Sequence, residues 1–134
     1  MKALLTNYHQ SPQKVRLIAN LIRGKSVPVA RAALTYAPQK SSAAILKLLD
    51  SAVANARQTG TSVDELFVKT ITVNKGAVMR RFMPKARGRA ASYAKTMSII
   101  ALELGTNAVA KKAMKKAAKK AAKKAAKPAE AKTE

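Results

Sequence analysis

The chain has 134 residues, of which 48% are apolar, so it is long enough for one domain with a modest core. Its 27 Lys and Arg against six Asp and Glu give a net charge of +21, typical of nucleic-acid-binding proteins. The absence of cysteine excludes disulfides, thiolate zinc sites and a cysteine nucleophile. No apolar run has the length of a signal peptide or a membrane span, so a cytoplasmic protein is expected.

Two short helices are predicted near the N-terminus. A serine followed by a proline is typical of an N-cap and first helical turn, and this pair occurs at Ser11. Apolar residues at helical spacing then predict a helix over residues 12–23. Ser26 begins the second helix, and Pro38 ends it.

A longer third helix is the most regular element of the sequence. We expect Ser41 or Ser42 to cap it and Gly60 to end it. Its wide apolar stripe consists of Ile45, Leu48, Leu49, Ala52, Val53 and Ala56. This helix should cover a large part of the core.

Two runs rich in β-branched residues are expected to pair as antiparallel strands. They are LFVKTITV at residues 66–73 and SIIALEL at residues 98–104, and a brief first strand is predicted at residues 3–7. Helices that are followed by strands favour an α+β fold, in which three helices pack on a small antiparallel sheet.

A long, protruding, basic β-hairpin is predicted over residues 74–98. Its segment NKGAVMRRFMPKARGRAASYAK, residues 74–95, holds seven Lys or Arg and no acidic residue. Like charges on neighbouring strands repel, so a polyanion is the expected partner. At about 3.3 Å per residue an arm of about a dozen residues reaches about 40 Å. Such a ribbon is marginally stable alone and should gain order when bound.

The composition changes near Gly105. Residues 106–134 carry ten Lys against two Glu and repeat the motif KKAA with almost no large side chain. We therefore expect an α+β domain at residues 1–105 and a disordered, Lys/Ala-rich tail at residues 106–134. The tail should become ordered only when it binds an anion.

Two groups of cations are candidates for binding a polyanion. The hairpin run is mostly Arg without a balancing acid, whereas edge strands that only need solubility carry few charges, often Lys; this difference favours binding. Around the first helix, Lys14, Arg16, Arg23 and Lys25 form a second basic patch. Alternatively, Arg23 and Lys25 only complement the helix dipole.

Other hairpin residues allow two interpretations each. Met79, Phe82 and Met83 either pack into crevices of a partner or pack across the hairpin. Gly76 and Gly88 either relieve backbone strain and allow a close approach, or mark a bulge.

The sequence contains no motif for catalysis, a cofactor or a metal. It has no P-loop, no dinucleotide fingerprint and no nucleophile motif. The single His9 has no ligand cluster beside it, and the adjacent Asp64 and Glu65 are expected to flank a turn. We therefore expect that the protein is not an enzyme and that it binds no cofactor, no metal and no small-molecule substrate.

Three blocks of this sequence closely resemble one known family. They are SPQKVRLIANLIRGK at residues 11–25, LKLLDSAVANA at 46–56 and VNKGAVMRRFMPKARGRA at 73–90, in unbroken order within residues 3–104. The similarity is to the bacterial family of large-subunit ribosomal proteins numbered twenty-two.

The resemblance implies a protein of the cytoplasmic ribosome that binds large-subunit (23S) ribosomal RNA beside neighbouring large-subunit proteins, with no membrane partner. It also implies a hairpin that lines the exit tunnel of the nascent polypeptide. The RNA-binding residues would be Lys14, Arg16, Arg23, Lys25, Lys75, Arg80, Arg81, Lys85, Arg87, Arg89 and Lys95. The tunnel-lining tip would be Met79, Arg80, Arg81, Phe82, Met83, Pro84, Lys85, Ala86, Arg87, Gly88, Arg89 and Ala90.

The returning strand departs from the family's pattern. Ser98, Ile99 and Ile100 stand where the family usually has Ser-His-Ile, so a histidine contact does not carry over. Ser92 and Thr96 stand at places often held by Arg. The returning strand therefore offers fewer basic contacts than usual.

Two other functional classes share parts of this composition. A histone-like protein that binds DNA non-specifically would share the Lys-rich tail, but an Arg-rich hairpin on a helical body favours docking into one shaped RNA. A membrane-active cationic peptide would need a large apolar face, which alternating pairs of Lys and Ala do not provide.

Overall fold

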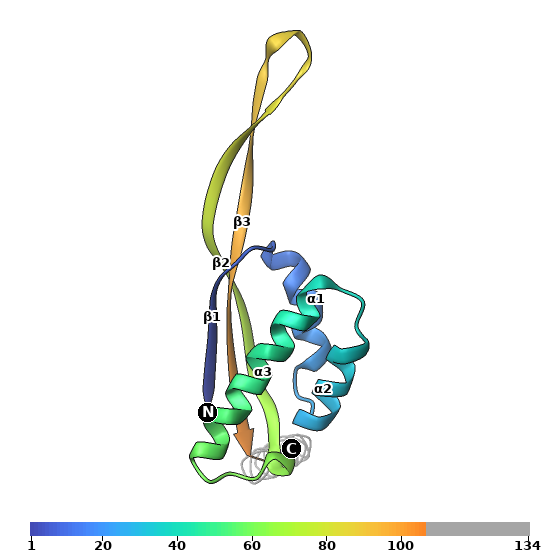
Figure 1. Ribbon diagram of the computed structural model, residues 1–134, viewed down its shortest axis with the longest axis vertical. Coiled ribbons are helices and arrows are strands. Elements are labelled where there is room, and N and C mark those ends of the chain that lie inside the picture. Colours follow the sequence, from blue (N-terminus) through green and yellow to red (C-terminus); the bar gives the residue numbers. More distant parts are fainter. Residues whose placement is uncertain (107–134) are drawn as a thin grey trace, which may run out of the picture.

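The computed structural model describes residues 1–106, which form one layer of three helices on a three-stranded sheet (Figure 1). The elements are β1 (Lys2–Tyr8), α1 (Pro12–Ile22), α2 (Val27–Tyr36), α3 (Lys40–Gln58), a 3₁₀ turn (Val63–Glu65), β2 (Leu66–Pro84), a second 3₁₀ turn (Ala86–Gly88) and β3 (Ala90–Thr106). The predicted α+β fold is confirmed. The predicted tail lies, apart from Thr106, outside the described residues.

The sheet is antiparallel, with β3 between β1 and β2. In the body Leu5 pairs with Ile100, and Ile71 pairs with Leu102. The two β-branched runs therefore pair as the sequence predicted. Because β2 is an outer strand, one of its edges has no neighbouring strand and needs other partners.

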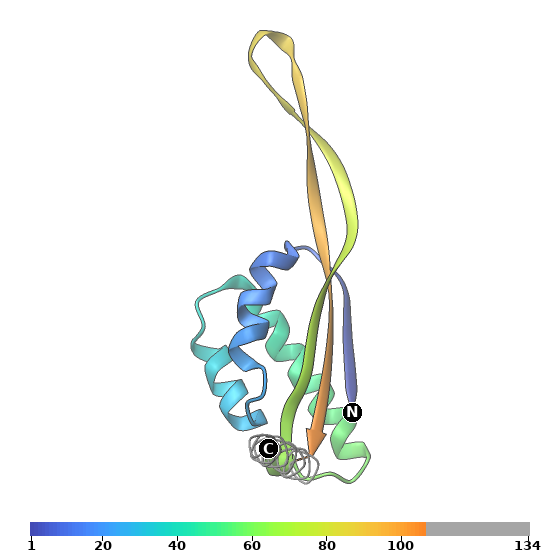
Figure 2. The same cartoon turned by 180° about the vertical axis from the view of Figure 1, so that it is seen from behind.

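The core lies between the helices and one face of the sheet. The stripe on α3 contributes the fully buried Ile45 and Leu49, and β3 contributes Ile100 and Leu102. Side chains alternate along a strand, so Ala101 points to the opposite face. No helix crosses that face when the sheet is viewed from behind (Figure 2).

The predicted cap of α3 is wrong. The N-cap is Gln39, and Ser41 and Ser42 are buried inside the first turn. The hydroxyl of Ser42 donates to the carbonyl oxygen of Gln39 (2.7 Å) instead of accepting from a free helical N–H. Burial of these two small side chains against the body thus outweighs their usual capping role.

The predicted hairpin is confirmed and extends far beyond the body (Figure 1). β2 has 19 residues and β3 has 17, and their pairing continues from Val78↔Thr96 to Pro84↔Ala90. The helices cover only the body-side half of each strand, so the outer half is a two-stranded ribbon without a third layer.

Candidate nucleic-acid interface

The hairpin carries positive charge on both of its faces. Arg80 pairs with Ala94, and the next residue, Arg81, pairs with Tyr93. Since consecutive residues on a strand point to opposite faces, the two guanidinium groups lie on opposite faces at neighbouring levels. Both arginines are exposed, as is Lys95 on the returning strand. A polyanion can therefore contact the ribbon from either side.

Large apolar side chains on the hairpin are left uncovered. Phe82 pairs with Ser92 and is 75% exposed, while Met83 pairs with Ala91 and is also exposed. These small partners cannot cover the large side chains opposite them. This exposure favours packing against a partner over packing within the hairpin, because bases can stack on an aromatic ring.

The tip gathers three cations within one tight loop. The backbone N–H of Lys85 donates to the carbonyl oxygen of Arg89 (2.7 Å), and a 3₁₀ turn fills the space between them. Arg87 at its centre has a φ of 56°, in the left-handed region. All three side chains are exposed, so the narrowest part of the hairpin has a high density of positive charge.

Both interpretations of Gly76 hold at the root of the hairpin. The register shifts between Lys75 and Val78, which is the predicted bulge. A Cβ added at Gly76 would lie 3.2 Å from Cγ1 of Ile99, so the opposite strand also approaches closely. Ile99 thus packs beside the bulge.

The second basic patch is divided by the structure. Lys14 is exposed on α1, and Lys25 is half-buried in the loop before α2. In contrast, the guanidinium of Arg16 donates to the carbonyl oxygen of Val73, and that of Arg23 donates to the carbonyl oxygen of Ile71. The two lysines are thus free of the hydrogen bonds that tie the two arginines to the outer edge of β2. The spacing of these four residues along the sequence does not indicate this difference.

Acidic side chains of the described residues are confined to the body. Asp50 on α3 forms an ion pair with Arg31 on α2 (3.2 Å), and Glu103 pairs with Lys2 (2.9 Å). The pKa of Glu103 is lowered mainly by the hydrogen bond from Lys2 and secondly by the positive charge of Lys2. No Asp or Glu occurs in residues 66–102, so the hairpin cations have no acidic neighbour on their own strands.

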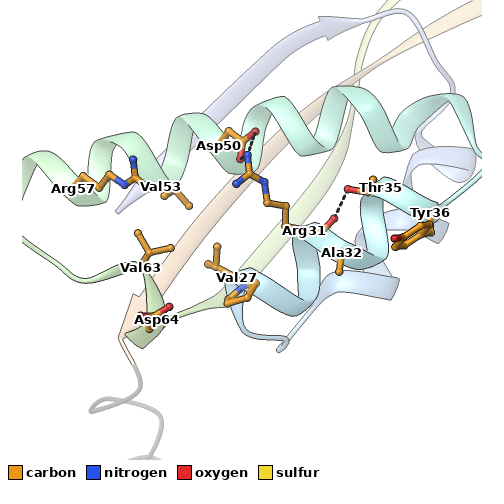
Figure 3. Close-up of a pocket in the computed structure, with 11 residues that line it drawn as sticks. Val27, Arg31, Ala32, Thr35, Tyr36, Asp50, Val53, Arg57, Val63 and Asp64 are labelled. Carbon is orange, nitrogen blue, oxygen red and sulfur yellow. Dashed lines mark hydrogen bonds and ion pairs between the residues drawn. The ribbon is translucent and has the colours of Figure 1, made fainter.

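A hollow between α2 and α3 has a different chemistry (Figure 3). Its volume is about 520 Å³, and it is lined by apolar side chains such as Val53 together with Arg31, Asp50, Arg57 and Asp64. The pair of Arg31 and Asp50 spans it (Figure 3). Mixed charges make it unsuitable for a polyanion. Sequence analysis did not single out this hollow, because its residues are far apart in the chain.

Residues 1–106 contain neither a cluster of metal-ligating side chains nor a helix that could span a membrane. In this part of the chain, His, Asp and Glu side chains nowhere gather in a group of three that would hold a metal ion. None of its helices combines the length and apolar character needed to span a bilayer.

The comparison with known families decides the identity. The model of the family described as "Ribosomal protein L22p/L17e" matches residues 3–105. The chain belongs to this family.

Individual members of the L22p/L17e family support this assignment. A protein of Citrifermentans bemidjiense, named "Large ribosomal subunit protein uL22", is 50% identical over 103 residues, which are 76% of this chain and 93% of the relative. Proteins of the same name are 48% identical in Pelobacter propionicus, over the same shares of both chains, and 49% identical in an Anaeromyxobacter species, over 79% of this chain and 74% of the relative.

Membership of the L22p/L17e family confirms the resemblance seen in the sequence. The chain is a large-subunit ribosomal protein, which acts in translation as a structural component and not as an enzyme. Its expected location in the cytoplasm, at the ribosome, follows from the same membership.

Proposed function

We propose that this protein binds large-subunit (23S) ribosomal RNA and that its hairpin lines the exit tunnel, where it meets the nascent polypeptide. Neighbouring large-subunit proteins would contact its body. The observation that carries this proposal is the ribbon itself, which is basic on both faces and free of acidic residues.

A two-faced basic ribbon fits insertion between RNA segments better than docking on a surface. A ribbon that lay on one surface would leave the guanidinium of either Arg80 or Arg81 pointing away from the RNA. Insertion lets both groups meet phosphates and lets Phe82 stack on a base, which compensates for its exposure in the free protein.

The proposed RNA-contacting residues comprise the hairpin cations and the patch on the body. On the hairpin they are Lys75, Arg80, Arg81, Lys85, Arg87, Arg89 and Lys95. On the body Lys14 and Lys25 offer ammonium groups, and Arg16 and Arg23 offer the N–H groups that β2 does not use. The tip, residues 79–90, would form the part of the tunnel wall that this protein supplies.

Competition binding tests the choice of RNA over DNA. The full-length protein is bound to a folded large-subunit RNA fragment at moderate salt and challenged with duplex DNA or with unfolded RNA of the same length. Specific complexes commonly exceed non-specific ones by about 10³-fold or more, so we expect a preference of that order for the folded RNA. Equal competition by duplex DNA would support the histone-like alternative instead.

Sedimentation of a salt-washed cell extract gives the corresponding test in the cell. We expect the protein to remain with the large subunit after loosely bound cationic proteins are removed, because contacts that depend on shape survive salt better than delocalised charge. Recovery with nucleoids would contradict the proposal.

A further inference from the structure

The outer edge of β2 is covered throughout the body by α1 and the loop that follows it. The N–H of Gly24 donates to the carbonyl oxygen of Val68 (3.0 Å), and the N–H of Val68 donates to that of Lys25 (2.9 Å). Further along, Arg23 donates to the carbonyl oxygen of Ile71 (3.2 Å). These bonds satisfy edge groups that would otherwise face water or another strand.

Arg16 makes the last contact of this series. Its Nε and one of its Nη atoms donate to the carbonyl oxygen of Val73, at 3.2 and 3.1 Å. The bulge between Lys75 and Val78 follows two residues later, and from there the hairpin leaves the body. Arg16 also lines a hollow with Lys75 and Thr96, so it lies in the angle between α1 and the root of the hairpin.

The second strand of the hairpin is held at the same level. Ser98 pairs with Lys75 across the hairpin and with Tyr8 on its other side. Its side chain is fully buried, and its hydroxyl donates to the carbonyl oxygen of Gln10. The segment that connects β1 to α1, together with the start of α1, therefore contacts both strands where the hairpin begins.

We propose that Arg16 and Ser98 are positioning residues, which set the direction of the hairpin before any RNA is bound. The direction matters because the hairpin is a lever. The ten residues from Asn74 to Met83 span about 33 Å at about 3.3 Å per residue, so a rotation of about 10° at the root moves the tip by about 6 Å. A hairpin aimed in advance loses less conformational freedom when it enters its site.

The geometry of the Arg16 side chain supports positioning over phosphate binding as its main role. Two N–H groups of one planar guanidinium reach the same carbonyl oxygen, an arrangement that a lysine ammonium does not reproduce. With Nε and one Nη occupied, this side chain has fewer donors left for a phosphate than the exposed Arg80.

Distance measurements on the free protein test the proposal without RNA. The chain has no cysteine, so nitroxide labels on Ser51→Cys in α3 and Ser92→Cys in the hairpin report one body-to-tip distance. We expect a single narrow distribution in the parent protein. Arg16→Ala and Ser98→Ala should each broaden it by several ångströms, the displacement that a loosened root of this length produces.

Two further variants separate the root contact from charge. Lys14→Ala removes one positive charge from the same helix without touching β2, so its distribution should remain narrow. Arg16→Lys keeps the charge but loses the two-donor contact, so its distribution should be broad. A narrow distribution in both Arg16→Ala and Ser98→Ala, with the folded body verified by circular dichroism, would overturn the proposal.

Salt dependence of RNA binding supplies a readout that distinguishes positioning from phosphate contact. This part rests on the proposed function. Loss of one phosphate contact lowers the slope of log K against log salt by about 0.7 to 0.9, whereas loss of positioning lowers the affinity at an unchanged slope. Arg16→Ala removes the root contact together with at most one phosphate contact, so we expect its slope to fall no more than that of Lys14→Ala while its affinity falls further. A lower slope with a narrow distance distribution would show that Arg16 is only a phosphate contact, and failure of the parent protein to prefer the RNA would refute the proposed function alone.

Discussion

The backbone N–H of Lys85 and the carbonyl oxygen of Arg89 form a 2.7 Å hydrogen bond that closes the tip of the hairpin. Inside this closure Arg87 has a φ of 56° and Gly88 has a φ of 68°. A Cβ added at Gly88 would have no atom within 4 Å apart from its chain neighbours, so only the left-handed backbone favours glycine there. The shape of the tip therefore depends on two residues in an unusual conformation.

Gly88→Ala should loosen the tip. A residue other than glycine in the left-handed region costs about 1 kcal/mol, which corresponds to about fivefold faster exchange of the Lys85 amide hydrogen. Arg87→Gly removes the same strain at the preceding position and should slow this exchange. Nuclear magnetic resonance of the free protein measures both rates, and equal rates in all three proteins would show that the closure does not depend on these φ angles.

Replacement of Arg80, Arg81, Arg87 and Arg89 by Ala should separate assembly from tunnel function. The body keeps its helices and its own cations, so the variant should still enter the large subunit. Loss of four positive charges from the tip changes the local potential along the proposed tunnel wall. We therefore expect ribosomes that contain the variant but respond differently to peptides that stall within the tunnel.

The matched control for this variant replaces the same four arginines by lysine. It keeps the charge and removes only the planar, two-donor geometry. Occupancy and stalling are measured on the same particles. If the alanine variant is fully incorporated and stalling is unchanged, the tip makes only a structural contact with RNA and has no role in stalling.

Removal of residues 111–134 should weaken non-specific binding of nucleic acid, which depends on charge and not on the shape of the site. These residues contribute ten Lys and two Glu, a net charge of +8, and almost no large side chain. Non-specific affinity for nucleic acid and its salt dependence should both fall, because fewer counterions are released. Incorporation into the subunit should persist, and its loss on truncation would show that the removed residues contribute specific contacts.

Leu49→Ala should strongly destabilise the body. The Leu49 side chain belongs to α3 and is fully buried in the core. Its truncation to alanine costs about 2–5 kcal/mol of stability. Leu17→Ala serves as the control, because Leu17 is 66% exposed on α1 and should cost about 0.5 kcal/mol or less. Urea unfolding measures both changes; similar losses of stability would mean that Leu17 is covered in solution.

Periodicity in the sequence was sufficient to predict the helices and strands. The stripe from Ile45 to Ala56 faces the core, and the two β-branched runs pair with each other. These patterns are reliable because burial of apolar area is the main driving force and does not depend on fine geometry. The predicted cap of α3 failed for the opposite reason, since the choice between Gln39 and Ser41 depends on how the preceding loop packs.

By itself the sequence predicted the class of partner, since seven cations without an acid between residues 74 and 95 favour a polyanion wherever the hairpin lies. Only the tertiary structure decided how individual cations are used. Arg16 lies 57 residues from Val73 in the chain, and the two meet because α1 packs beside the outer edge of β2. A carbonyl on an open edge competes with a phosphate for the same N–H groups, and this competition arises only when folding brings the edge to the helix.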